Sequence, residues 1–220
     1  MNALAIGVDL ARTRLGTSAV WVTLGASLLA CTLGAWLERG AGGAHLSLLG
    51  MTFGLAIPLT ALSLSHRVFD GRRLAESFEE PARWGADRRH VLLGALAVLG
   101  PMLAGWFALL AAVVVIVAGG DVLDAARSAS VGAQAGLIYA CGLTAASTWG
   151  KRGHGRVGWI ALDWAFGAST SALSLPFPRA HLANLLGAAP PLDLSQLTSG
   201  ALLIALASAA LLYAQLRLPR

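Results

Sequence analysis

Residues 91–118 read VLLGALAVLGPMLAGWFALLAAVVVIVA, an apolar stretch of 28 residues without a charged side chain. As a helix this stretch would rise roughly 42 Å at 1.5 Å per residue. The hydrocarbon core of a bilayer is only about 30 Å thick. A soluble core does not need so long an apolar helix, and the stretch therefore predicts a membrane span.

Five further stretches have a similar character and are close to the length that crosses a bilayer. They occupy residues 17–37, 45–65, 129–149, 157–175 and 197–216. The composition agrees, because 56% of the residues are hydrophobic and only 12% are charged, against roughly a quarter charged in soluble domains. The mean hydropathy is +0.69. We predict an all-α integral membrane protein with six transmembrane helices in a single domain, residues 1–220.

The basic residues are divided very unequally between alternate connections of the predicted spans. Cytoplasmic connections of membrane proteins hold the excess of Lys and Arg, so both termini are predicted to be cytoplasmic. The net charge of +5 is then expected beside anionic lipid rather than nucleic acid. Only Arg39, Arg127 and Arg179 fall on the other side, whereas the richer set is Arg12, Arg14, Arg67, Arg72, Arg73, Arg83, Arg88, Arg89, Lys151, Arg152, Arg156, Arg217 and Arg220.

Two segments outside the spans are expected to lie at the membrane surface. Residues 1–16 interleave apolar and charged side chains, which favours an N-terminal amphipathic interfacial helix; a frayed tail is the alternative. Residues 179–187 contain the apolar residues Leu182, Leu185 and Leu186 and are bracketed by Pro178 and Pro190. They predict a short interfacial or re-entrant helix between spans five and six, with a plain loop as the alternative.

The charged segment between spans two and three, residues 66–90, is the most informative connection. It contains Gly71, Pro81 and Gly85. Because proline disrupts a helix interior, we expect a short helix over 74–80, a break, and a new helix start with Asp87 as N-cap. The alternative is a solvated linker whose charges only enforce topology.

Within the spans, small residues and one acid stand out. Gly132, Gly136 and Ala140 recur every fourth residue, which allows close helix packing, either inside the chain or between two copies. Asp163 is the acidic residue furthest inside a predicted span, and an intramembrane carboxylate is costly enough to suggest a function. Because Asp163 lies near the predicted cytoplasmic end of its span, a structural role fits it equally well.

The sequence lacks the residue patterns of several kinds of functional site. No Gly-rich phosphate-binding loop precedes Lys151, so ATP hydrolysis is not expected from this chain. The five histidines are scattered without the spacing of a metal site, and no bound cofactor is expected. Cys31 and Cys141 lie in spans, where cysteine usually acts as a small hydrophobe. The residues before Cys31 also resemble a lipoprotein signal, whose cleavage would leave five spans.

The arrangement resembles the permease subunits of type 2 ATP-binding-cassette exporters over the whole chain. The local likeness lies in Glu76-Ser77-Phe78-Glu79 and in residues 85–94, GADRRHVLLG, which are similar to that family's pattern of Ser/Thr, bulky apolar residue and Glu, followed by a small residue, Arg and an apolar run. The chain departs from the family in having Glu76 before the serine and Glu80-Pro81-Ala82 in place of a leucine-rich continuation.

The resemblance implies a transport subunit of the bacterial inner membrane that works as a dimer, with a second copy or a homologous permease. ATP and Mg²⁺ would be bound by separate cytoplasmic ATPases. The segment that engages the ATPase would comprise Glu76, Ser77, Phe78, Glu79, Glu80, Arg83, Trp84, Arg88 and Arg89. Two other hypotheses remain open, namely a proton-coupled secondary transporter that uses Asp163 and a membrane assembly subunit that does not transport.

Overall fold

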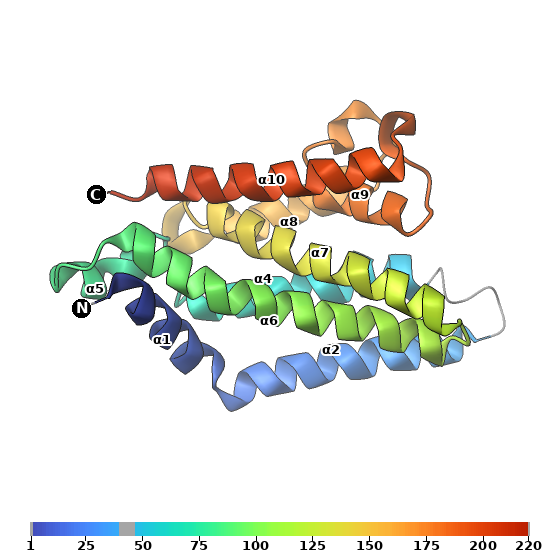
Figure 1. The fold of residues 1–220 in the computed structure, drawn as a ribbon, viewed down its shortest axis with the longest axis horizontal. Coiled ribbons are helices and arrows are strands. Elements are labelled where there is room, and N and C mark those ends of the chain that lie inside the picture. Colours follow the sequence, from blue (N-terminus) through green and yellow to red (C-terminus); the bar gives the residue numbers. More distant parts are fainter. Residues whose placement is uncertain (1, 40–46, 220) are drawn as a thin grey trace.

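The computed structural model describes residues 2–39 and 47–219, and in these ranges the chain is a bundle of helices without strands (Figure 1). The longer helices run back and forth along one axis. In chain order the elements are α1 (Ala3–Leu15), α2 (Ser18–Leu37), the π-helix η1 (Ser47–Ala56), α4 (Ile57–Val68), η2 (Glu76–Phe78), α5 (Glu79–Arg83), α6 (Arg88–Val117), α7 (Val122–Ala146), η3 (Lys151–Gly153), α8 (Gly155–Phe166), η4 (Ala172–Ser174), α9 (Pro178–Leu185), η5 (Pro191–Asp193) and α10 (Gln196–Arg217).

Five helical segments of the described ranges are long and apolar enough to cross a membrane. They correspond to five of the six predicted stretches, and the all-α prediction is confirmed for the described residues. The start of the second stretch at residue 45 lies outside those residues. The five segments are Ser18–Leu37, Leu48–Val68, Arg88–Val117, Val122–Ala146 and Gln196–Arg217.

The prediction of one continuous span over residues 157–175 is wrong. Helix α8 ends at Phe166 after 12 residues, which span about 18 Å, too little for a hydrocarbon core of about 30 Å. Beyond it, Ser169 Oγ accepts from the Ser171 amide at 3.0 Å, and Ser171 Oγ accepts from the Leu173 amide at 3.3 Å. Such local side-chain bonds compete with the helical ladder, and the helix stops here.

The segment between α8 and α10 contains the predicted short helix, α9. It is tied to the bundle by buried polar side chains. His181, fully buried, lies 2.9 Å from the carbonyl oxygen of Leu175 through Nε2. Asn184 Nδ2 donates to Ser199 Oγ of α10 at 2.8 Å. The alternative of a plain loop does not fit these contacts.

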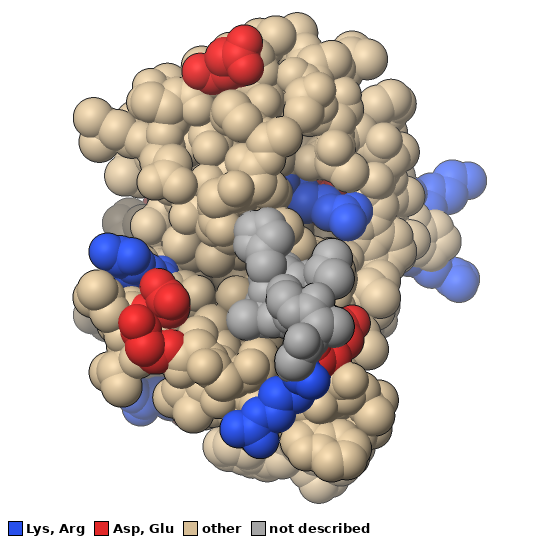
Figure 2. All heavy atoms as spheres, turned by 90° about the vertical axis from the view of Figure 1, so that its right-hand side faces the viewer, with Lys and Arg blue, Asp and Glu red and all other residues tan. Residues whose placement is uncertain are grey.

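Both chain ends lie at the same end of the bundle, which we call the terminal end (Figure 1). The connections at residues 69–87 and 147–154 are also at this end, together with α5. The division of basic residues read from the sequence is therefore a division between the two ends of the molecule. Figure 2 shows the opposite end, where charged side chains are few and scattered.

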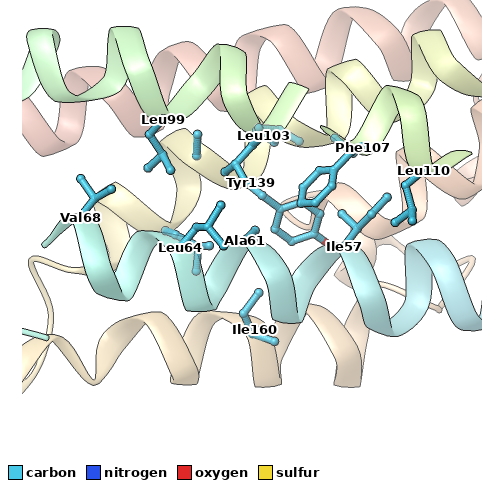
Figure 3. Close-up of a cluster of buried hydrophobic side chains, with 14 of the residues drawn as sticks. Ile57, Ala61, Leu64, Val68, Leu99, Leu103, Phe107, Leu110, Tyr139 and Ile160 are labelled. Atoms are coloured by element: carbon cyan, nitrogen blue, oxygen red, sulfur yellow. The ribbon is translucent and has the colours of Figure 1, made fainter. Parts of the chain in front are cut away.

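The interface between α6 and α7 forms the centre of the bundle. A Cβ added to Gly132 would lie 2.3 Å from the Phe107 carbonyl oxygen, and one added to Gly136 would lie 2.3 Å from the Ala104 amide nitrogen. The small-residue ridge, including the buried Ala140, thus packs inside the chain. Side chains of α4, α6, α7 and α8 fill the adjacent core (Figure 3), among them Ile57, Leu64, Leu103, Phe107, Tyr139 and Ile160.

Helix α1 crosses the start of α6 through a second close contact. A Cβ at Gly7 would lie 2.0 Å from the Val91 carbonyl oxygen, and one at Gly94 would lie 2.1 Å from the Leu4 carbonyl oxygen. The N-terminal helix is therefore present as predicted, and it is packed onto the bundle by backbone contact in addition to any contact with lipid.

We expect Gly136→Val to destabilise the protein by about 1–3 kcal/mol, because the larger side chain must push α7 away from α6. Gly105→Val is the matched control, since a Cβ at Gly105 meets no atom within 4 Å. Thermal unfolding of both purified variants in detergent measures the difference. Equal melting temperatures for the two variants would contradict the close α6–α7 contact.

Candidate functional site

The coupling segment, defined as Glu76–Arg89, is anchored to the bundle by two of its predicted functional residues. Ser77 Oγ lies 2.7 Å from the Phe69 carbonyl oxygen and 2.9 Å from that of Arg73, and can donate to either. The Phe78 ring is fully buried and meets the edge of Phe69 at 6.1 Å between centroids. Ser77 and Phe78 hold the segment in place, so they are not available for direct contact with a partner.

Helix α5 carries the exposed part of the coupling segment. Glu79 and Arg83 lie 3.9 Å apart on its solvent face, and Trp84 directly after it is 79% exposed. Glu80 is also exposed. A tryptophan this exposed is typical of residues that become buried in a protein interface or that lie at the membrane–water interface.

The predicted break at Pro81 is wrong, and the reason is the position of the helix start. Because α5 begins at Glu79, Pro81 lies in its first turn, where a helix amide has no internal acceptor and proline is tolerated. The chain instead breaks at Gly85, whose φ is +79°.

The new helix start predicted at Asp87 is confirmed. Its side chain accepts from the Arg89 amide at 2.9 Å, and this bond lowers the pKa of the Asp87 carboxyl. Arg88 and Arg89 are partly exposed in the first turn of α6. Glu76 is half-buried, and its Oε2 accepts from the Arg73 amide at 3.3 Å. The nine predicted residues therefore form three groups. Ser77 and Phe78 are buried against the bundle. The exposed residues are Glu79, Glu80, Arg83 and Trp84, and the partly exposed ones are Glu76, Arg88 and Arg89.

A groove of about 490 Å³ separates α5 from α1. The sequence analysis did not predict that α1 and α5 lie close together. The interleaved apolar and polar residues of α1 did indicate an amphipathic helix. Arg14 fixes the base of α1 by donating from Nη1 to the Val68 carbonyl oxygen at 2.6 Å, and burial lowers its pKa. The groove is lined by Ile6, Asp9, Leu10, Thr13, Arg14, Glu80, Pro81 and Trp84.

Arg156 has a position in the structure that the sequence pattern does not predict. The sequence places it among the basic residues of the predicted cytoplasmic connections, yet its side chain is only 1% exposed. Its guanidinium donates to the carbonyl oxygens of Gly153 at 3.2 Å, Ser65 at 3.2 Å and Arg72. It also lies over the Phe69 ring, 5.6 Å from the centroid. These contacts join α4, the start of α8 and the connection that leads to the coupling segment.

Burial lowers the pKa of Arg156 to about 10, so the side chain remains charged at neutral pH. Its guanidinium lies close against the backbone of Gly153. Gly153 has a φ of +65°, and a Cβ there would lie 2.1 Å from Arg156 Nη2. Arg73 supports the same junction, because its Nε donates to the Gly150 carbonyl oxygen.

Asp163 has a structural explanation in this fold. It is fully buried in α8, where Oδ2 accepts from the Tyr139 hydroxyl at 2.7 Å and Oδ1 accepts from the Arg179 amide at 3.2 Å. Arg179 belongs to the first turn of α9, whose amides have no acceptor within the helix. The carboxylate thus caps α9 from a neighbouring helix, and an anion at a helix N-terminus is favourable.

The residue next to Asp163 repairs another helix defect. Pro58 has no amide hydrogen, so the Gly54 carbonyl oxygen lacks its α-helical donor. Trp164 Nε1 donates to this oxygen at 2.8 Å. Together Asp163 and Trp164 dock α8 onto two neighbouring segments, and no separate chemical step is needed to account for either residue.

The chain was compared with protein-family models, with curated proteins and with solved structures, and none of the three comparisons gave a match. Among the described residues, no group of three or more His, Cys, Asp and Glu side chains is placed to hold a metal ion. A function for this chain is therefore inferred from the sequence resemblance and from the contacts and exposure of residues at the terminal end.

We expect Arg156→Leu to lower stability by about 1–3 kcal/mol or more, because buried carbonyl oxygens lose their donors. The loss should be local, with faster hydrogen exchange in residues 69–77. Lys151→Leu removes an exposed charge nearby and is the control. Hydrogen exchange in detergent measures both variants, and unchanged protection of residues 69–77 in Arg156→Leu would show that Arg156 does not hold this connection in place.

Proposed function

We propose that this chain is the transmembrane permease subunit of an ATP-driven exporter. In this proposal the chain forms the substrate pathway as a dimer, with a second copy or a homologous permease. Separate cytoplasmic ATPases of the ATP-binding-cassette type bind ATP and Mg²⁺ and drive it. It is a multi-pass protein of the bacterial inner membrane with both termini in the cytoplasm.

The observation that carries the proposal is the combination of an exposed and an anchored part within one short segment. Helix α5 presents Glu79, Glu80, Arg83 and the open indole of Trp84, while Ser77 and Phe78 fix the segment to the bundle. A mechanical coupling element requires both properties, because a force applied at its surface must reach the spans. A solvated linker requires neither.

The position of the segment also favours this function. It lies between the second and third predicted spans, at the bundle end that carries both termini (Figure 1), which is where the resembled family engages its ATPase. The sequence offers no phosphate-binding loop of its own, so an external ATPase is the natural source of energy. The break between α8 and α9 agrees with the re-entrant helices that the family carries before its last span.

A dimer is compatible with the exposed apolar side chains of the outer helices. Trp21, Leu29 and Trp36 on α2 are 65%, 69% and 59% exposed. Lipid and a second permease both suit such a surface. This part of the proposal rests on the resemblance.

The contacts of Asp163 support the proposal of an ATP-driven permease more than that of a proton-coupled carrier. Asp163 is already bound by Tyr139 and the Arg179 amide, and these contacts give it a role in holding α9. A carrier would require this carboxylate to exchange a proton with a pathway. A non-transporting assembly subunit remains the third hypothesis, and it predicts no turnover in the presence of the ATPase.

The topology can be tested with single cysteines in a variant that carries Cys31→Ala and Cys141→Ala. We expect Lys151→Cys, at the terminal end, to be protected from an impermeant thiol reagent in intact cells and to react after lysis. Val122→Cys, 80% exposed at the opposite end, should react in intact cells. The reverse pattern would show that the orientation is inverted.

The coupling role can be tested with a double charge reversal, Glu79→Lys with Glu80→Lys. We expect the ATPase that co-purifies with the wild-type chain to bind at least roughly 30-fold more weakly, since loss of charge pairing at an interface costs about 2 kcal/mol or more. Titration of the purified ATPase onto the permease measures this affinity.

The matched control for that reversal is Glu38→Lys with Asp124→Lys, which makes the same change in net charge at the opposite end. The control should bind the ATPase like the wild type. Wild-type affinity in the Glu79 and Glu80 variant, or an equal loss in the control, would contradict coupling through α5.

A further inference from the structure

A second cavity at the terminal end has a composition unlike that of the groove beside α5. It has a volume of about 410 Å³ and lies between the last turns of α4 and the start of α8. Basic side chains dominate its polar lining, and no carboxylate belongs to it. The lining residues are Leu59, Leu62, Ser63, His66, Arg67, Arg152, Gly153, His154, Arg156 and Val157.

The basic groups of this cavity are not neutralised by ion pairs among the described residues. The four ion pairs in the described ranges involve Arg72, Arg83, His90 and Arg127 instead. The nearby carboxylate of Asp70 lies 3.3 Å from Arg72. Arg67 Nε is enclosed by protein and has no hydrogen-bond partner. The cavity therefore presents basic groups that have no ion-pair partner among the described residues.

The helix ends beside the cavity add to the positive field. The C-terminus of α4 would attract cations, but Arg156 already occupies its Ser65 carbonyl oxygen. The start of α8 supplies the positive end of a helix dipole, which favours an anion. With Arg67, Arg152 and the charged Arg156 around it, the cavity is suited to a phosphate or another compact anion.

The apolar part of the lining restricts the kind of anion. Leu59 and Val157 are 47% and 58% exposed, and Leu59 belongs to the membrane-crossing segment Leu48–Val68. The cavity therefore opens from the basic end onto the apolar flank of the bundle. A ligand that joins a phosphate to hydrocarbon chains matches both parts, and basic pockets between helices at a membrane boundary bind anionic headgroups.

We propose that this cavity is a binding site for an anionic phospholipid, with the phosphodiester held by Arg67 and Arg152 and the acyl chains lying along Leu59 and Val157. The site is independent of ATPase coupling. The phospholipid would contact the connection between α7 and α8, next to the buried side chain of Arg156.

Native mass spectrometry of the delipidated protein in detergent tests the site. The probes are phosphatidylglycerol, phosphatidylcholine, glycerol phosphate and inorganic phosphate. We expect phosphatidylglycerol to bind more tightly than the other three. Arg67→Gln with Arg152→Gln should weaken phosphatidylglycerol roughly 10- to 30-fold, given about 1 kcal/mol per basic residue near anionic lipid. Arg12→Gln with Arg83→Gln, the same change in charge outside the cavity, should leave binding unchanged.

Equal binding of phosphatidylglycerol to the cavity variant and the wild type would overturn the proposal. Equal binding of phosphatidylcholine would overturn its anionic character, and tight binding of glycerol phosphate or inorganic phosphate would assign the cavity to a soluble anion instead. If Arg67→Gln impairs folding, Arg152→Gln with His154→Gln replaces it, because both of these side chains are exposed. The same outcomes then apply.

Discussion

The guanidinium of Arg156 donates to three backbone carbonyl oxygens that come from separate parts of the chain. The Arg156 side chain is only 1% exposed, and a buried charge or carbonyl oxygen without a hydrogen-bond partner is costly. Arg156 serves the end of α4 at Ser65, the following connection at Arg72 and the turn at Gly153. The shape of the terminal end depends on this one side chain, because the coupling segment continues directly from the connection that it holds.

The same constraint governs the other irregular parts of the bundle. Pro58 leaves the Gly54 carbonyl oxygen without a helical donor, and Trp164 supplies one at 2.8 Å. The break after α8 leaves the first amides of α9 without acceptors, and Asp163 supplies one at 3.2 Å. Helix defects are tolerated in this protein where a side chain from another helix completes the hydrogen bonding. This is why the polar residues Arg156, Asp163 and Trp164 are concentrated in α8.

Local patterns were enough to predict much of the fold. Five apolar stretches, the cap at Asp87 and the close packing ridge at Gly132 and Gly136 follow from length, capping chemistry and residue size. The prediction of a continuous span over residues 157–175 failed because serine hydroxyls beyond Phe166 form hydrogen bonds with nearby backbone amides. Average hydropathy does not detect this effect. The predicted break at Pro81 failed because α5 begins at Glu79, which places the proline in the first turn of the helix.

The candidate site was less predictable because its contacts are distant in sequence. Arg156 meets the carbonyl oxygens of Ser65 and Arg72 across separations of 91 and 84 residues, and nothing in the spacing of the arginines distinguishes it from the exposed ones. Ser77 and Phe78 were selected by resemblance as contact residues, whereas they face inward. The exposed residues of α5 remain the part of that prediction on which the proposed function rests.

The central claim is that an ATP-binding-cassette ATPase docks on the coupling segment, and a photo-crosslinking amino acid at position 84 tests it most directly. After irradiation of cells that express the chain, protein sequencing by mass spectrometry identifies what is attached. The same amino acid at position 197, 86% exposed near the opposite end, is the control. We expect attachment of an ATPase with a phosphate-binding loop from position 84 and none from position 197. Absence of an ATPase at position 84, or its capture from position 197, would contradict it.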